Sequence, residues 1–146
     1  MPTIDATFPA GTFTVEQKQQ LANDLSHALV KWEGTAGDPT AIGRVWVYLN
    51  EAVQGSFAVG GTLQFENPQI RYFVNVQVPD GMLNQERKNG LVADVTRILL
   101  EAEGSASDFP HSLRVYCLIH EIRDGNWGTA NKGLTLKEMA ALTSVR

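Results

Sequence analysis

The residues of this chain best suited to chemistry are Pro2, next to the initiator methionine, and two arginines, Arg44 and Arg114. A proline at the start of a chain carries a secondary amine on a rigid ring, and an α-amino group titrates nearer to neutrality than a lysine does. Apolar surroundings and a nearby arginine both lower the pKa of such an amine. A neutral amine can act as a general base at pH 7, and a guanidinium can bind a carboxylate through two hydrogen bonds. Such an amine could take a proton from carbon or from an enol oxygen beside a carbonyl and return it elsewhere.

Other reactive side chains offer less. Cys117 falls in the aliphatic row of an expected strand, where no neighbouring cation favours the thiolate. His27, His111 and His120 are not at metal-ligand spacing with one another or with Cys117, so we expect no metal site. The glycine pairs lack the strand, turn and helix of a dinucleotide fold, and there is no P-loop pattern. The sequence therefore predicts chemistry without a cofactor.

The composition argues against several classes of partner. The chain has 146 residues, with 12 Lys and Arg against 16 Asp and Glu, and a net charge of −4 at pH 7. This acidic balance, without a basic run, indicates that neither nucleic acid nor an anionic membrane is a partner. No apolar stretch approaches the roughly 20 residues that span a bilayer. We expect no signal peptide, and a single cysteine cannot form an internal disulfide. These features predict one globular domain in the cytoplasm.

An internal repeat organises the chain. Residues 2–58 align without a gap with residues 72–128, seventy positions later, and 15 of these 57 positions are identical. Unrelated sequences of this composition should share about one position in sixteen, so chance does not explain the match. Two copies are too few for a solenoid, which favours a duplicated supersecondary unit. Residues 129–146 then form a C-terminal tail.

Each repeat predicts a strand, a helix and a second strand. The apolar residues alternate in the strands and recur at helical spacing between them, and Thr14 and Asn84 are expected N-caps. We expect strands at residues 3–8, 44–50, 73–78 and 114–120, and helices at residues 14–32, 84–102 and, in the tail, 135–142. Two right-handed β-α-β units predict an α+β two-layer sandwich, in which a mixed four-stranded sheet carries two helices on one face.

The second strand of each repeat has two different faces. Its aliphatic residues, such as Val47 and Leu49, should lie beneath the helices. The opposite set is aromatic and cationic: Arg44, Trp46 and Tyr48 in the first copy, and Arg114, Tyr116, Leu118 and His120 in the second. Such a face is too apolar for solvent and too polar for a plain core, so we expect an oligomer that buries it.

These features together resemble the tautomerase superfamily. The segment from Arg44 to Gly61, with its Gly-x-Phe-x-x-Gly-Gly ending, is similar to the second strand and hairpin of 4-oxalocrotonate tautomerase. The segment from Arg114 to Gly128 resembles the same region of fused members, including macrophage migration inhibitory factor and cis-3-chloroacrylic acid dehalogenase. The resemblance covers most of the chain. It implies a single tautomerase-like domain over residues 1–146, made of the repeats 2–58 and 72–128 with the tail 129–146, that assembles as a homotrimer.

The resemblance also implies a site. The family's signature is a proline that becomes the N-terminus when the initiator methionine is removed, which makes Pro2 the expected general base. Arg44 and Arg114 both match the arginine that binds the substrate carboxylate. Tyr116 matches a tyrosine that other fused members place near the proline of a neighbouring subunit. The implied activity is keto–enol isomerisation of a small carboxylic acid without a cofactor.

Structural roles compete with these functional ones. Phe57 and Trp127 resemble the hydrophobic wall of the pocket, although hairpin aromatics often serve packing alone. Tyr116 could equally be an interface aromatic. Either arginine could instead form an ion pair across subunits, with Asp5, Glu51 or Glu121 as the expected carboxylates.

The sequence departs from the family pattern at several positions. Thr12 or Phe13 replaces an arginine of the 4-oxalocrotonate enzyme, and Leu29 replaces a histidine of the dehalogenase. Asn126 or Trp127 replaces the glutamate that activates water in the dehalogenase.

Two alternatives to keto–enol isomerisation stay open. The first is hydratase, dehalogenase or decarboxylase chemistry with a protonated Pro2 as acid. The second is a trimeric binding protein without catalysis.

Overall fold

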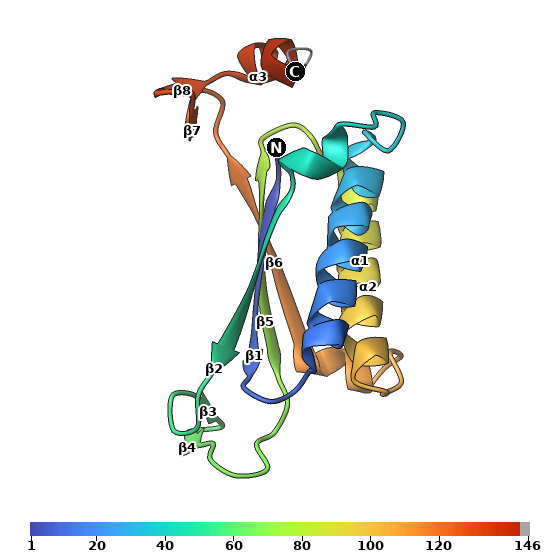
Figure 1. Ribbon diagram of the computed structural model, residues 1–146, viewed down its shortest axis with the longest axis vertical. Helices are drawn as coiled ribbons and strands as arrows, with labels where there is room; N and C mark the ends of the chain where they lie inside the picture. Colours follow the sequence, from blue (N-terminus) through green and yellow to red (C-terminus); the bar gives the residue numbers. More distant parts are fainter. Residues whose placement is uncertain (144–146) are drawn as a thin grey trace.

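The computed structural model describes residues 1–143 and has two layers, a sheet and a pair of helices that cover one of its faces (Figure 1). The first unit contains β1 (Thr3–Pro9), α1 (Val15–Glu33), the 3-10 helix η1 (Ala41–Arg44) and β2 (Trp46–Ala52). The second contains β5 (Tyr72–Pro79), α2 (Gln85–Ala102), η2 (His111–Arg114) and β6 (Val115–Ile122). The remaining elements are β3 (Ala58–Val59), β4 (Thr62–Leu63), β7 (Trp127–Thr129), β8 (Lys132–Leu134) and α3 (Leu136–Thr143).

The four main strands form one mixed sheet in the order β2-β1-β5-β6. Within each unit the two strands are parallel, as a helical crossover requires, whereas β1 and β5 are antiparallel. This is the predicted α+β fold. Because β1 and β5 run in opposite directions, equivalent positions of the two repeats lie at opposite ends of the sheet. Figure 1 shows the β3–β4 hairpin at one end and the β7–β8 hairpin with α3 at the other, near the N-terminus.

Both long helices begin at the predicted caps. The Thr14 hydroxyl accepts a hydrogen bond from the Gln17 backbone N–H, and the Gln17 side chain accepts one from the Thr14 backbone N–H. This reciprocal pair is a capping box, which satisfies two helix-terminal N–H groups. The Asn84 side chain caps α2 through a single hydrogen bond, which it accepts from the Arg87 backbone N–H at 2.8 Å. Gly34 ends α1 in the left-handed conformation that glycine adopts without strain.

The core lies between the helices and the sheet. Ile4 and Ala6 of β1 and Val74 and Val76 of β5 are completely buried beneath leucines of α1 and α2. Burial of each aliphatic side chain of this size stabilises the fold by about 1.5–3 kcal/mol. Val47, Leu49, Cys117 and Ile119 pack against the edge of this core, as the alternation predicted.

The opposite face of the sheet is open and aromatic in the single chain. Trp46 is 62% exposed, Tyr48 58% and Tyr116 67%, and Phe73 and Leu118 are exposed beside them. We call this set the aromatic face. Its existence confirms the predicted division between the two sides of the second strands.

The predicted starts of the second strands were wrong. Arg44 and Arg114 lie at the ends of η1 and η2, and the strands run later, to Ala52 and Ile122. The Val45 N–H donates to the carbonyl of Ile42, three residues back, which closes a tight turn that alternation alone does not reveal. The two arginines are therefore placed by turns at the start of each strand. Among the described residues, no helix combines the length and the apolar character needed to cross a bilayer.

Candidate functional site

The repeat creates two equivalent cavities at opposite ends of the sheet. The first, of about 270 Å³, is lined by Pro2, Arg44, Trp46 and Trp127, and we call it the Pro2 cavity. The second, of about 380 Å³, is lined by the residues seventy positions from these, and we call it the Tyr72 cavity. Its equivalent lining residues are Tyr72, Arg114, Tyr116 and Phe57. The β3–β4 hairpin contributes lining residues to the Tyr72 cavity and the β7–β8 hairpin to the Pro2 cavity. The two hairpins lie at opposite ends of the sheet (Figure 1).

The six site residues predicted from the sequence divide between these cavities. Pro2, Arg44 and Trp127 come together in the first, and Arg114, Tyr116 and Phe57 in the second. Within one chain, therefore, neither Arg114 nor Tyr116 joins Pro2. Arg44 is the arginine that shares a cavity with the N-terminus.

The position of Pro2 is fixed by the start of the parallel pair β1–β2. The carbonyl oxygen of Pro2 accepts a hydrogen bond from the backbone N–H of Trp46 at 3.3 Å, and Thr3 pairs with Trp46 in the strand register. Pro2 itself is buried. Burial lowers the pKa of the Met1 α-amino group, the charge of Glu33 opposes this shift, and the charge of Arg44 adds to it. The terminal amine thus lies in surroundings that favour its neutral form.

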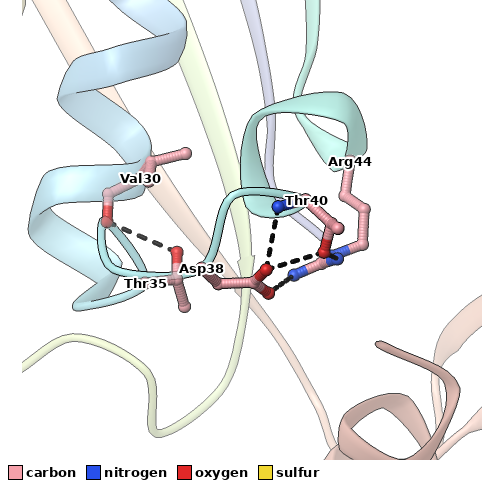
Figure 2. A network of polar contacts seen from close by, with 5 residues as sticks. All are labelled: Val30, Thr35, Asp38, Thr40 and Arg44. Atoms are coloured by element: carbon pink, nitrogen blue, oxygen red, sulfur yellow. Dashed lines mark hydrogen bonds and ion pairs between the residues drawn. The ribbon is translucent and has the colours of Figure 1, made fainter. Parts of the chain in front are cut away.

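Arg44 is held by a compact polar network (Figure 2). Its two terminal nitrogens donate to Asp38 Oδ2 and to Thr40 Oγ1, both at 2.6 Å. Asp38 Oδ1 in turn accepts hydrogen bonds from the backbone N–H and the hydroxyl of Thr40. The Arg44 guanidinium, followed by Thr40, holds the pKa of the Asp38 carboxyl well below its usual range. Arg44 therefore presents a fixed cation at the wall of the Pro2 cavity.

A third cavity, of about 220 Å³, lies on the other side of Pro2, and we call it the α3 cavity. Met1, Pro2, Glu33, Asp38 and Arg44 line it, and Leu136 and Met139 of α3 line it as well. The Glu33 side chain is buried here, and burial raises the pKa of its carboxyl while the terminal amine and Arg44 lower it. The N-terminus and Arg44 thus border both cavities.

The Tyr72 cavity has a different chemistry. Arg114 donates to the buried carboxylate of Glu103 and, at 3.3 Å, to the carbonyl of Ile70. Burial raises the pKa of Tyr72, and the Glu103 carboxylate raises it further. A phenol with a raised pKa stays protonated at neutral pH and cannot serve as a base. Among the described residues, those that line the Tyr72 cavity include an arginine but no terminal amine or lysine.

Within the chain, each arginine has a carboxylate partner of its own. Arg44 pairs with Asp38 and Arg114 with Glu103. An ion pair across subunits with Asp5, Glu51 or Glu121 stays a prediction. In the single chain Glu51 and Glu121 pair with the equivalent lysines Lys18 and Lys88. Sequence reasoning also missed Asp38 and Thr40 as partners of Arg44, and Glu33 as a neighbour of the N-terminus. The available signal was the identity of Glu33 with Glu103 and of Asp38 with Asp108 in the repeat.

Comparisons with known proteins agree with this architecture. Residues 73–137 match the family model described as Tautomerase enzyme. A fused 4-OT solved as a symmetric trimer has a TM-score of 0.71 and 22% identity, covering 99% of this chain and 99% of that chain. Pt0534 inactivated by 2-oxo-3-pentynoate has a TM-score of 0.70 and 27% identity, covering 94% of this chain and 97% of that chain. N1, a member of the cis-3-chloroacrylic acid dehalogenase family, has a TM-score of 0.73 and 17% identity, covering 99% and 92%. A comparison with curated proteins found no match.

Proposed function

Because this chain belongs to the tautomerase superfamily, whose members are generally catalytic, we propose that it is a cofactor-free tautomerase of small enol or keto carboxylic acids. Pro2, freed by removal of Met1, is the general base. The observation that carries this proposal is the placement of a buried Pro2 and a fixed Arg44 around one cavity with apolar walls. The two β-α-β units and the tail act as one domain, since β1 and β5 join them in a single sheet.

The proposed reaction is a proton transfer within one substrate. Arg44 binds the substrate carboxylate through the guanidinium N–H groups that Asp38 and Thr40 leave unused. The neutral Pro2 amine takes the proton from the enol oxygen, and the resulting ammonium returns a proton to carbon, so that enol becomes ketone with no net change in atoms. Pro2 is buried, and burial lowers the pKa of the adjacent Met1 α-amino group, which supports this role for the amine of Pro2 once Met1 is removed. Trp46 and Trp127 exclude water from the substrate's apolar part.

The proposed assembly is a homotrimer that completes this site. The aromatic face is a large exposed apolar patch, which in a globular protein marks an interaction surface. A fused 4-OT with the same fold is a trimer, which supports the same assembly here. Since Tyr116 lies far from Pro2 along the sheet of its own chain, we propose that Tyr116 of a neighbouring subunit reaches the Pro2 cavity. Its hydroxyl would then donate a hydrogen bond to the substrate's developing oxyanion.

A panel of substrates tests the proposed reaction. Wild-type protein whose loss of Met1 is verified by mass spectrometry is assayed by ultraviolet absorbance for ketonisation of 2-hydroxymuconate and phenylenolpyruvate. The same protein is assayed with an acetylenic acid and a β-keto acid. Acceleration on the enols supports the tautomerase. Turnover of only the acetylenic or β-keto acid replaces it with a hydratase or a decarboxylase, and no turnover of any substrate favours a binding protein.

A further inference from the structure

The equivalent glutamates of the two repeats have different hydrogen-bond partners. Glu33 and Glu103 occupy equivalent positions at the C-terminal ends of α1 and α2. The Glu103 carboxylate accepts a hydrogen bond from Arg114. Arg44, the equivalent of Arg114, donates instead to Asp38 and Thr40. Glu33 therefore does not have the arginine that its counterpart has.

Local sequence explains why the arginines differ. The residue equivalent to Thr40 is Pro110, which has no hydroxyl and cannot hold an arginine. The residue equivalent to Asp38 is Asp108, whose side chain is exposed and faces His111 at 3.6 Å. Arg114 has neither partner and donates to Glu103. In the first repeat Arg44 donates to both partners, so Glu33 receives no hydrogen bond from it.

Glu33 is buried without a partner for one of its oxygens. The residue is 7% exposed, and its Oε1 makes no hydrogen bond to any of residues 1–143. Burying a carboxylate without a compensating charge is costly, and an opposite charge beside it lowers that cost. Such a charge would have to come from a group that faces Glu33 in the α3 cavity.

The charged groups that face this carboxylate are few. Arg44 and Asp38 line the α3 cavity, but they pair with each other. The turn after β5 contributes Pro79 and Met82, and α3 contributes Leu136, Met139 and Ala140, all apolar in the side chain. Among residues 1–143, the charges that attract Glu33 are the terminal amine, which has the larger effect, and Arg44, which has the smaller one. Removal of Met1 transfers that amine to the ring nitrogen of Pro2, which lines the same cavity.

We propose that Glu33 is the counter-ion of the Pro2 ammonium, a positioning residue that stabilises the proton Pro2 takes from its substrate. This inference rests on the proposed function, in which Pro2 is the base. A buried amine that gains a proton becomes an unpaired charge in mainly apolar surroundings, and a carboxylate beside it lowers the cost of that state. The role is comparable to that of the carboxylate that stabilises the imidazolium in a Ser-His-Asp triad. In the second repeat no described residue with an amine lines the equivalent cavity, and Arg114 neutralises Glu103.

Titration of the amine tests the proposal directly. The ¹⁵N shift of labelled Pro2 is followed against pH by NMR in the processed wild type, in Glu33→Gln and in the matched control Glu103→Gln. We expect the amine pKa to fall by about one unit or more in Glu33→Gln, because an attractive opposite charge is lost. The control, which alters the equivalent glutamate at the far end, should leave that pKa unchanged. Equal amine pKa values in wild type and Glu33→Gln overturn the proposal.

Wild-type protein provides a second readout that does not depend on the folding of a variant. The side-chain carboxyl carbon of Glu33 should shift at the pH where the Pro2 amine titrates, whereas that of Glu103 should not. A Glu33 carbon that shows no step at that pH overturns the proposal.

Kinetics separate this inference from the function on which it rests. The acidic limb of the pH–rate profile should move to lower pH in Glu33→Gln, together with a lower kcat. If Pro2→Ala keeps full activity, the proposed function fails whatever Glu33 does. If Pro2→Ala is inactive but Glu33→Gln keeps the wild-type amine pKa and pH profile, only the role of Glu33 fails.

Discussion

Arg44 and Arg114 occupy equivalent positions seventy residues apart, yet Arg44 is held by Asp38 and Arg114 by Glu103. The duplication has therefore produced two cavities of related shape and different chemistry. Only the cavity that contains Arg44 also contains the N-terminus. The difference supports the proposal that the substrate binds in the Pro2 cavity, because no terminal amine lines the Tyr72 cavity.

Arg44 should contribute more to substrate binding than Arg114. A charge-assisted hydrogen bond contributes about 1.5–3 kcal/mol, so Arg44→Ala should raise KM for an enol acid by roughly 10- to 100-fold. Arg114→Ala is the matched control and should change KM less than Arg44→Ala. Steady-state kinetics with both variants check this. A larger effect of Arg114→Ala would place an arginine of a neighbouring chain at the substrate carboxylate.

Tyr116 should act on the Pro2 cavity of a neighbouring chain. Pro2→Ala and Tyr116→Phe chains are each expected to be nearly inactive as pure assemblies. When the two are mixed and reassembled, some sites combine an intact Pro2 from one chain with an intact Tyr116 from the other. Activity above that of either parent is the expected result. Mixtures that remain as inactive as their parents, despite exchange of subunits seen by mass spectrometry, would exclude a shared site.

The aromatic face should control assembly. Tyr48→Glu introduces a charge on this face, and burying an unpaired charge in an interface is costly. Sedimentation velocity should show a shift from a trimer to a smaller species. Val15→Glu is a suitable control, because Val15 is an exposed apolar residue at the start of α1 and outside this face. Equal sedimentation of Tyr48→Glu and wild type would contradict an interface at the aromatic face.

The sequence was sufficient for the sheet, the helices and their caps, because these depend on local periodicity and on short-range hydrogen bonds. It correctly separated the buried row of β2, with Val47, from the exposed row, with Tyr48. It missed that Arg44 and Arg114 end 3-10 turns, since each arginine and the valine after it continue the polar and apolar alternation of the strand that follows. Local patterns also could not reveal which site residues meet, because that depends on the antiparallel pairing of β1 with β5. The sequence also did not reveal that Glu33 lacks the arginine partner that Glu103 has. That difference depends on Thr40, which accepts a hydrogen bond from Arg44, and on Pro110, which cannot accept one from Arg114 through a side chain.

The C-terminal helix α3 should detach at low pH. Glu138 accepts hydrogen bonds from Lys132 and from the Thr135 backbone N–H, and these contacts lower its pKa to about 2. A carboxyl with a depressed folded-state pKa stabilises the fold above its unfolded value, near 4.5, and this stabilisation is lost as pH falls toward about 2. Hydrogen-exchange protection factors of α3 should therefore fall across this range, while those of β5 persist.

Glu138→Gln supplies the control for this pH effect. Its α3 helix should be less protected at neutral pH and should show little further change on acidification. Because Leu136 and Met139 line the α3 cavity, the same variant should make that cavity more open to solvent. Unchanged protection of α3 from pH 5 down to about 2 in the wild type would contradict the role assigned to Glu138.

The Pro2 amine is proposed as the catalytic base, and the variant Pro2→Ala tests this role most directly. Ketonisation of an enol acid is followed for the processed wild type and for processed Pro2→Ala, with circular dichroism to confirm that both are folded. General-base catalysis contributes about 10²- to 10⁴-fold, and Pro2→Ala keeps only a primary amine without the rigid ring, so kcat/KM should fall by up to that range. If Pro2→Ala accelerates ketonisation as well as the wild type does, Pro2 is not the base and the account is wrong.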